Sequence, residues 1–225
     1  MVILVLVTVD KFSIYCYFII LGGVFMYKNI IFDLGNVLLS FNPMEYLKSK
    51  ISEEKIQEVY KAIFQSEEWI MLDRGTITEK EAINNIIEKN SIYRDDISLA
   101  FEDWYAILKP IEETIKVLED LKSKGYNIYY LSNFHELAFK EVSIKNSFFE
   151  LFDGGVVSYE EKIIKPEEEI YRLILKRYNL TPSETIFIDD TKVNVEGAEK
   201  LGITTIFLEN PRKLREELRK LSLDI

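Results

Sequence analysis

Short apolar runs alternate with longer amphipathic segments along most of the chain. Five of the runs are rich in β-branched and aromatic residues and are bounded by Gly, Asn, Asp or Ser, which is typical of strands buried on both faces. They are KNIIFD (residues 28–33), YNIYYLSN (126–133), GGVVS (154–158), ETIFIDD (184–190) and ITTIFLEN (203–210). We expect each run to form one strand of a common sheet.

Between the later runs, apolar residues recur every three or four positions, which is the pattern of helices with one buried face. These segments are residues 111–125, 166–179, 195–202 and 211–221. Gly125 and Gly202 stand where helix C-caps belong. Strands that alternate with helices through short connections form a parallel sheet with helices on both faces. The sequence therefore predicts an α/β fold with a Rossmann-like, doubly wound parallel sheet.

Residues 42–109 differ from the rest, because they show amphipathic helical patterns and no convincing strand. Ser52 and Thr78 each stand as an N-cap ahead of acidic residues in the first turn of such a pattern. An insert after the first strand would lie over the carboxyl ends of the strands, where α/β sheets bind ligands. We therefore expect an α/β core of residues 26–41 and 110–225 with an inserted helical cap of residues 42–109.

Residues 1–25 are apolar, but they do not match a targeting segment. They lack the basic region and the small-residue cleavage site of a secretory signal, and Asp10 and Lys11 interrupt the run. The remaining apolar run, residues 12–26, is shorter than the about 20 residues that cross a membrane. Met26 directly precedes the first core strand, so we expect it to be the natural start and residues 1–25 to be a non-native extension. A membrane anchor is the alternative.

Composition narrows the class of protein. Hydrophobic residues make up 48% and charged residues 29% of the chain, as expected of a packed globular protein. The formal net charge is -10, and no cluster of Lys and Arg stands apart from compensating Glu, so we expect no nucleic acid and no membrane as partner of the core. Cys16 is the only cysteine, which excludes an internal disulfide and suits a cytoplasmic protein. We expect a monomer or a homodimer.

Polar residues follow four of the predicted strands, at the points where the strands end. They are Asp33, Ser132 with Asn133, Lys165 in the segment after the third run, and Asp189 with Asp190. Because the carboxyl ends of parallel strands meet at one edge of a sheet, these residues are expected to share one site. Carboxylates that converge in one crevice need a cation between them, and hard oxygen ligands suit Mg²⁺. These groups together suit phosphoryl transfer.

Four stretches in this order resemble the haloacid dehalogenase (HAD) superfamily, specifically its phosphatases with a helical cap after the first strand. The stretches are IIFDLGNVLL (residues 30–39), YYLSN (129–133), KPEEEIY (165–171) and TIFIDDTKVNVEGAEKLGITTIFL (185–208). The DLGNV form most resembles α-glucose-1-phosphate phosphatases and the phosphatase domain attached to some epoxide hydrolases. The resemblance extends over residues 26–217 and is weakest across the expected cap.

The resemblance implies that Asp33 is the nucleophile, which forms an aspartyl phosphate that water then hydrolyses. It also implies Mg²⁺ ligands at Asp33, at Asp190 and at the backbone carbonyl of Gly35. Asp189 is implied as a neighbouring ligand or as a residue that orients the others. Asn194 is either a supporting residue behind the metal or a helix-surface residue.

By the same resemblance, Ser132 with Asn133 binds the phosphate, and Lys165 neutralises it and holds the nucleophile. Lys162 is a nearby competitor for the role of Lys165, and His135 is the only histidine of the chain. In the expected cap, Trp69, Asp73, Arg74 and Gly75 are expected to form a substrate-facing turn. Arg74 is the best candidate for a polar contact with substrate, and a salt bridge within the cap is the alternative.

Gly35 departs from the family pattern, because most phosphatases of the superfamily carry there a second Asp that protonates the leaving group. A glycine has no acid–base group, so either the substrate has a better leaving group or the cap supplies the proton donor. The sequence predicts a Mg²⁺-dependent phosphatase for a small phosphorylated metabolite such as a sugar phosphate. The alternatives are a catalytically weak phosphometabolite-binding or interaction protein and a phosphomutase, and Gly35 disfavours the phosphomutase. A dehalogenase is also disfavoured, because the segment LLSFNP offers no Arg.

Overall fold

The computed structural model describes residues 2–8, 14–20 and 27–225. Strands β1 (Val2–Thr8) and β2 (Ile14–Ile20) pair antiparallel, an arrangement that the sequence pattern had not indicated. Met26, the expected natural start, lies outside the described residues, so that expectation stays a prediction. In these three ranges, no helix combines the length and the apolar character that crossing a membrane requires.

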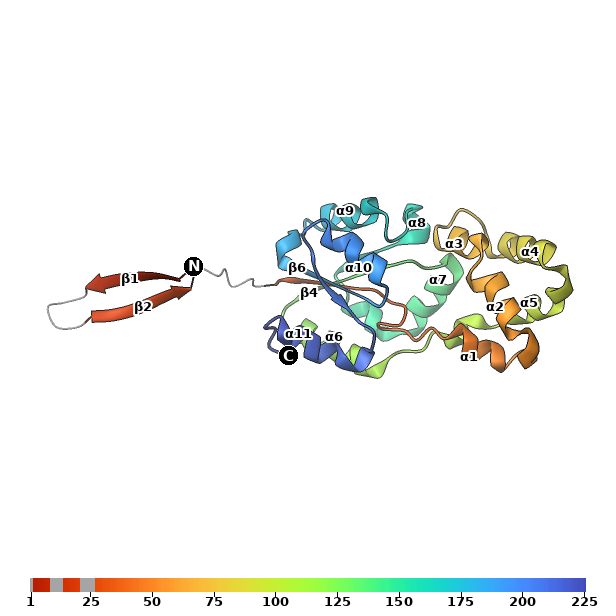
Figure 1. The fold of residues 1–225 in the computed structure, drawn as a ribbon, viewed down its shortest axis with the longest axis horizontal. Helices are drawn as coiled ribbons and strands as arrows, with labels where there is room; N and C mark the ends of the chain where they lie inside the picture. Colours follow the sequence, from red (N-terminus) through yellow and green to blue (C-terminus); the bar gives the residue numbers. More distant parts are fainter. Residues whose placement is uncertain (1, 9–13, 21–26) are drawn as a thin grey trace.

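The core of the molecule is a five-stranded sheet in which every neighbouring pair is parallel (Figure 1). Its strands are β3 (Asn29–Phe32), β4 (Asn127–Ser132), β5 (Gly154–Val157), β6 (Thr185–Asp189) and β7 (Thr204–Phe207), in the spatial order β5-β4-β3-β6-β7. Each strand falls within one of the five apolar runs, so the α/β prediction is confirmed. The four residues of β3 are all buried, as befits the central strand of the sheet.

Helices cover both faces of this sheet. On one face, α6 (Glu112–Ser123), α7 (Glu136–Lys145) and α11 (Leu214–Lys220) pack with Ile30 and Phe32 in one apolar cluster. On the other face, α9 (Glu168–Arg177) and α10 (Lys192–Glu199) pack against Ile31 and Phe187 in a second cluster. Because side chains alternate along a strand, Ile30 and Ile31 serve opposite faces. The sheet is therefore doubly wound, as predicted.

The chain between β3 and β4 is helical, and we call residues 43–107 the helical segment. It comprises α1 (Pro43–Lys48), α2 (Ile56–Phe64), α3 (Glu67–Asp73), α4 (Glu79–Lys89) and α5 (Arg94–Phe101), with 3₁₀ turns at Glu53–Lys55, Ser91–Tyr93 and Trp104–Ile107. In Figure 1 it forms one end of the molecule, beyond the sheet and beside α7 and α8 (Ser158–Glu161). The boundaries expected for the cap and the core stay predictions.

The structure confirms the helix N-cap predicted at Thr78 but not the one predicted at Ser52. Thr78 forms a complete capping box with Glu81, which satisfies two backbone donors at the start of α4. The Ser52 side chain makes no capping hydrogen bond, because a 3₁₀ turn intervenes before α2 begins at Ile56. Gly125 and Gly202 have left-handed φ angles of 86° and 79° after α6 and α10, which confirms both expected helix ends.

The expected turn around Trp69 is wrong in its first part, because α3 continues through Asp73. Ser66 caps this helix by accepting a hydrogen bond from the Trp69 backbone N–H at 3.1 Å. The chain turns only at Arg74 and Gly75, where Gly75 has a φ of 67° and lies so close to Tyr159 that a Cβ would clash with its backbone.

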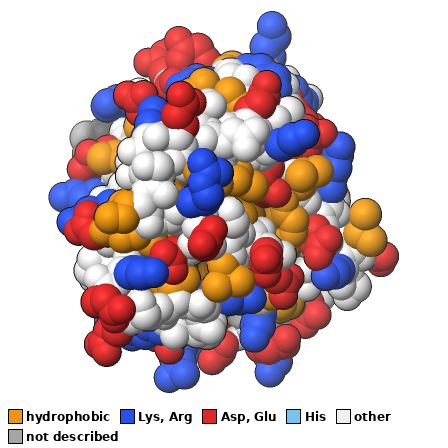
Figure 2. Space-filling model, turned by 90° about the vertical axis from the view of Figure 1, so that its right-hand side faces the viewer, with side chains coloured by type: hydrophobic (Ala, Val, Ile, Leu, Met, Phe, Trp, Pro, Cys, Tyr) orange, Lys and Arg blue, Asp and Glu red, His pale blue; other side chains and the backbone are white. Residues whose placement is uncertain are grey.

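The surface of the helical segment carries both signs of charge. Figure 2 faces this end of the molecule and shows acidic and basic side chains interspersed over it, with hydrophobic side chains between them. Exposed apolar residues of this segment include Ile70, Met71 and Ile92. Mixed charge of this kind gives no extended potential of one sign.

Candidate active site

Three carboxylates meet at the carboxyl edge of the sheet. Asp33 directly follows β3, Asp189 ends β6, and β3 and β6 pair in a register that sets Phe32 beside Ile188. One carboxylate oxygen from each of Asp33, Asp189 and Asp190 lies within 4.8 Å of the others. The parallel register therefore brings together residues that are more than 150 positions apart, as the sequence predicted.

Lys165 is buried within this cluster. Its Nζ lies 2.9 Å from Asp33 Oδ1 and 2.7 Å from Asp189 Oδ2, and it donates to the Leu131 carbonyl at 3.0 Å. Burial alone would lower the pKa of Lys165, but the Asp189 and Asp33 carboxylates outweigh it and raise that pKa. The lysine is therefore charged. Lys162, the competitor, is exposed and donates to the Gly75 carbonyl instead.

Asp33 Oδ1 is held by several donors. The Ser132 hydroxyl donates to it at 2.6 Å and the Leu34 backbone N–H at 2.7 Å, in addition to the contact with Lys165. These contacts fix the direction of the carboxylate. Burial raises the pKa of Asp33 to about 7, although Lys165 opposes the rise. The charge of Lys165 alone therefore does not keep the pKa of Asp33 in its usual range. A second cation beside Asp33 would favour the carboxylate form.

The second and third carboxylates differ in their surroundings. Asp189 is fully buried, and its Oδ1 accepts from the Thr191 backbone N–H at 2.7 Å while Asn194 Nδ2 lies 3.2 Å from both oxygens. Asn194 is thus a buried supporting residue and not a helix-surface one. Asp190 is half-buried and accepts from Asn36 Nδ2 at 3.0 Å.

Asn36 was missed by the sequence interpretation. Its φ of 51° is one that Asn adopts more readily than most residues, and this conformation turns its amide toward Asp190. The Asn that follows Gly in DLGN was the available signal, because Gly-Asn marks a sharp turn. Asn133, which was expected to bind phosphate, exchanges hydrogen bonds with the backbone of Lys165 at 2.8 and 3.0 Å. It therefore fixes the loop that carries the lysine.

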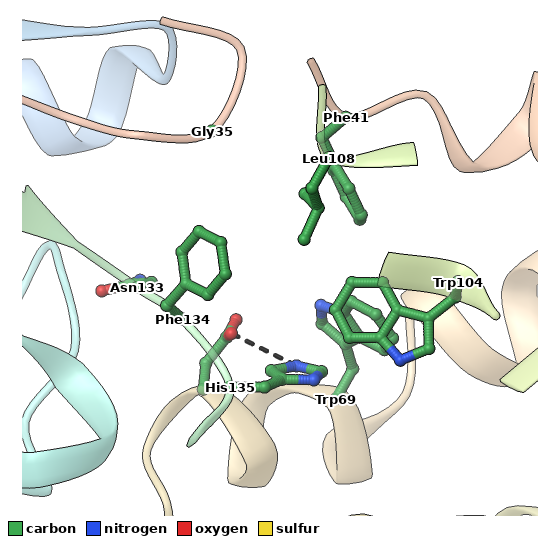
Figure 3. A pocket seen from close by; sticks show the side chains of 9 residues that line it. Gly35, Phe41, Trp69, Trp104, Leu108, Asn133, Phe134 and His135 are labelled. Carbon is green, nitrogen blue, oxygen red and sulfur yellow. Dashed lines mark ion pairs between the residues drawn. The ribbon is translucent and has the colours of Figure 1, made fainter. Parts of the chain in front are cut away.

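Two adjoining cavities open from this cluster. The first, of about 350 Å³, is lined by Asp33, Ser132, Lys165 and Asp190 together with residues shared with the second. The second, of about 120 Å³, has mainly apolar walls: Phe41, Trp69, Trp104, Leu108 and Phe134, with Asp73 and His135 (Figure 3). The shared residues are Gly35, Phe41 and Asn133. A Cβ at Gly35 would meet nothing within 4 Å, so the space beside this residue is open.

Arg74 lies apart from these cavities. Its guanidinium donates to both carboxylate oxygens of Glu167, at 2.9 and 2.5 Å, and to the Lys162 carbonyl at 3.2 Å. The pair joins the end of α3 to the loop that follows Lys165. It is a salt bridge, but it connects the helical segment to the core and does not lie within the expected cap.

Breaking this pair tests whether Arg74 binds substrate. We expect Arg74→Met and Glu167→Gln each to change kcat/KM by about fivefold or less, and the double variant to be no worse, because a partly exposed pair contributes at most about 1 kcal/mol. Steady-state kinetics of the three variants measure this. A loss of about 100-fold in Arg74→Met alone would instead establish the substrate contact expected from the sequence.

Comparison with known proteins identifies the family. The model of the haloacid dehalogenase-like hydrolases matches residues 27–202, and the chain belongs to that family. It is 28% identical to a sesquiterpene phosphatase of Aspergillus oryzae over 87% of this chain and 96% of the relative. It is 25% identical to a D-ribitol-5-phosphate phosphatase of Bacteroides thetaiotaomicron, over 86% and 97%. Other relatives are longer, and the chain spans 19% and 36% of the length of two of them.

A solved structure supports the same assignment. A HAD family enzyme of Bacteroides thetaiotaomicron, crystallised with magnesium and inorganic phosphate, superimposes with a TM-score of 0.63 at 29% identity. The match covers 80% of this chain and 93% of that enzyme. The same enzyme in a magnesium complex gives a TM-score of 0.69 over 86% and 99% of the two chains.

Proposed function

We propose that the protein is a Mg²⁺-dependent phosphatase, which hydrolyses a small phosphomonoester through an aspartyl phosphate on Asp33. The observation that carries the proposal is the buried network of Asp33, Lys165 and Asp189 beside Asp190, at the wall of one cavity. A nucleophilic carboxylate held by a charged lysine, next to further carboxylates, is an arrangement that phosphoryl transfer can use. Binding alone does not need it.

The donor set fits Mg²⁺. Asp33 and Asp190 would hold the ion together with the backbone carbonyl of Gly35, because all three line the same cavity. Asp189 is a less suitable direct ligand, since Lys165, Thr191 and Asn194 already occupy its oxygens. We assign it the task of positioning Lys165. When bound, the ion neutralises charge on the phosphate and on the carboxylates around it.

The reaction proceeds in two displacements. An Asp33 oxygen attacks phosphorus, the bond from phosphorus to the ester oxygen breaks, and the alcohol leaves with a proton. Water then attacks the phosphorus of the aspartyl phosphate, which releases inorganic phosphate and restores the Asp33 carboxylate. Lys165 stays charged throughout, and the Ser132 hydroxyl, whose one proton is donated to Asp33 in the free protein, can turn to donate it to a phosphate oxygen instead.

The second cavity receives the alcohol part of the substrate. Its walls are mostly aromatic and aliphatic, with Phe41, Trp69 and Trp104 among them, so we propose an alcohol that presents an apolar face. The relatives include phosphatases named for a sesquiterpene and for a sugar alcohol phosphate, which are opposite in polarity. A sugar phosphate, which the sequence suggested, is therefore one of the two kinds of substrate to be compared.

Phosphate release from matched monophosphates of an alkyl or prenyl alcohol and of a sugar tests the proposal. We expect turnover that a chelator lowers by about 100-fold or more and that added Mg²⁺ restores, because the carboxylates then lose their cation. The alkyl or prenyl ester should have the higher kcat/KM. The higher value for the sugar ester would contradict the apolar assignment, and no turnover of any ester by protein that binds Mg²⁺ would favour the phosphometabolite-binding alternative.

A further inference from the structure

A carboxyl group and an imidazole from different parts of the chain meet at the wall of the apolar cavity. Asp73 is the last residue of α3, and His135 directly precedes α7. Asp73 Oδ1 lies 3.3 Å from His135 Nε2, and Figure 3 marks this contact with a dashed line. Both residues line the cavity that Gly35 also lines. In Figure 3, Gly35 lies across the open space from His135.

His135 is almost completely enclosed. Its side chain is 3% exposed, and its ring centre lies 4.2 Å from that of Trp69 and 5.2 Å from that of Trp104. The contact with Asp73 is short but not aligned as a hydrogen bond, so neither ring nitrogen has a hydrogen-bond partner in the described part of the chain. Buried polar groups without partners are rare and call for an explanation. Burial lowers the pKa of His135 to about 3, so the imidazole is neutral.

Asp73 is set deep in the molecule but stays accessible. Its side chain is 21% exposed, which leaves it in contact with the cavity. Burial raises the pKa of Asp73 to about 7; Lys165 lowers it and Asp33 raises it further. Lys165 and Asp33 are thus the charged groups whose fields act on this carboxyl, and His135 is the titratable group in contact with it. A carboxyl of this kind holds a proton near neutral pH and can both give and take it.

We propose, building on the phosphatase function, that Asp73 is the acid–base residue which the chain lacks at Gly35. As the bond from phosphorus to the ester oxygen breaks, the Asp73 carboxyl transfers its proton to that oxygen, and the neutral alcohol leaves. The resulting carboxylate then takes a proton from the water that attacks the aspartyl phosphate. Phosphate is released, and Asp73 and Asp33 return to their starting states. His135 is a positioning residue, which keeps the Asp73 carboxyl directed to the cavity.

The location of Asp73 gives the helical segment a part in the chemistry. Asp73 reaches the cavity only while the end of α3 is held against the core, and the Ser158 hydroxyl donates to the Asp73 backbone carbonyl at that point. The Arg74–Glu167 pair joins the next residue to the core. Closure of the segment would therefore deliver the proton donor at the same time as it excludes water.

Asp73→Asn tests the proposal, because the amide keeps the shape of the side chain and removes the proton. We expect kcat/KM for an alkyl phosphate to fall by about 10²- to 10⁴-fold, the usual contribution of general acid–base catalysis. For p-nitrophenyl phosphate, whose leaving group needs no proton, kcat/KM should fall by less than about tenfold, because kcat/KM reports the first displacement and not the water step that Asp73 also serves. Asp95 is exposed and lies in the same helical segment, so Asp95→Asn serves as the matched control. It should change kcat/KM for neither ester.

Turnover of the aryl ester shows that a variant preparation is folded and that the phosphatase chemistry at Asp33 is intact. An equal loss of kcat/KM on both esters, or no loss of kcat/KM on the alkyl ester, would overturn the assignment of Asp73. Absence of aryl phosphate turnover in the unchanged protein would overturn the phosphatase function instead. The two failures are thereby distinguishable.

The pH profile of kcat/KM and the variant His135→Leu provide two further tests of the proposal. Because an acid must be protonated to act, kcat/KM of the alkyl ester should fall about tenfold per pH unit above about pH 7, and Asp73→Asn should remove this descent. A descent that persists in the variant would count against Asp73. His135→Leu should lower kcat/KM of the alkyl ester about tenfold and leave kcat/KM of the aryl ester unchanged, whereas a purely structural role would lower both.

Discussion

Turnover of every phosphomonoester is expected to fall by about 10⁵-fold when Asp33 is replaced by Asn, because losses of about this size follow the removal of a catalytic nucleophile. The carboxamide has nearly the same shape, and its oxygen can still accept hydrogen bonds from Ser132 and Leu34. It is, however, a poor nucleophile and carries no charge. The loss should therefore be chemical and should not reflect misfolding.

Phosphate release measures this effect, with Asp224→Asn, an exposed substitution of the same kind, as the control. Brief exposure of the unchanged protein to substrate, followed by acid quenching and mass spectrometry, should place a phosphoryl group on the peptide that contains Asp33. Substantial turnover in Asp33→Asn, or a phosphoryl group on another peptide, would refute the assigned nucleophile.

Replacement of Lys165 by Met is expected to lower both stability and activity. The lysine side chain is 1% exposed, and without it the buried carboxylates of Asp33 and Asp189 lose their positive partner. Removing one partner of a buried ion pair costs about 3–5 kcal/mol, because the remaining charge stays desolvated. For a chain of this size that corresponds to a fall in Tm of about 10 °C. Turnover should fall by about 10³-fold, since charge on the phosphate loses its fixed counter-charge.

Thermal unfolding of Lys165→Met beside Lys176→Met separates the buried lysine from an exposed one of α9. The control should change the free energy of unfolding by no more than about 0.5 kcal/mol, as is usual for surface positions. A similarly small change in Lys165→Met would mean that the lysine does not stabilise the two carboxylates, and the electrostatic account of the site would then be wrong.

The five strands and the convergence of their polar ends could be predicted because both depend on local pattern and on one general property of parallel sheets. The apolar runs end where β3, β4 and β6 end, so the order of Asp33, Ser132 and Asp189 along the chain already placed them at one edge. Ser52 shows the limit of local signals, since a 3₁₀ turn separates it from the helix that it was expected to cap.

Contacts between the helical segment and the core could not be predicted in the same way. Arg74 was expected to bind substrate or to pair within the cap, and it pairs with Glu167, which is 93 positions away. Nothing in the local pattern of either residue indicates the other. Asp73 and His135 are likewise unpredictable from local pattern: each is an ordinary residue at a helix end, and only their burial beside one cavity gives them unusual acid–base properties.

The sequence alone determined the α/β class, the carboxylates and lysine of the site, and the absence of an acid at Gly35. The α/β class and the convergence of the carboxylates follow from side-chain periodicity and from residue types at strand ends, which are local, whereas Lys165 and the missing acid at Gly35 were indicated by the resemblance to HAD phosphatases. Only the tertiary structure decided which oxygens of Asp189 are already occupied, that Asn36 supports Asp190, and that Asp73 approaches the cavity beside His135. Desolvation and distance between segments determine these properties, and both arise only when the helical segment packs against the sheet.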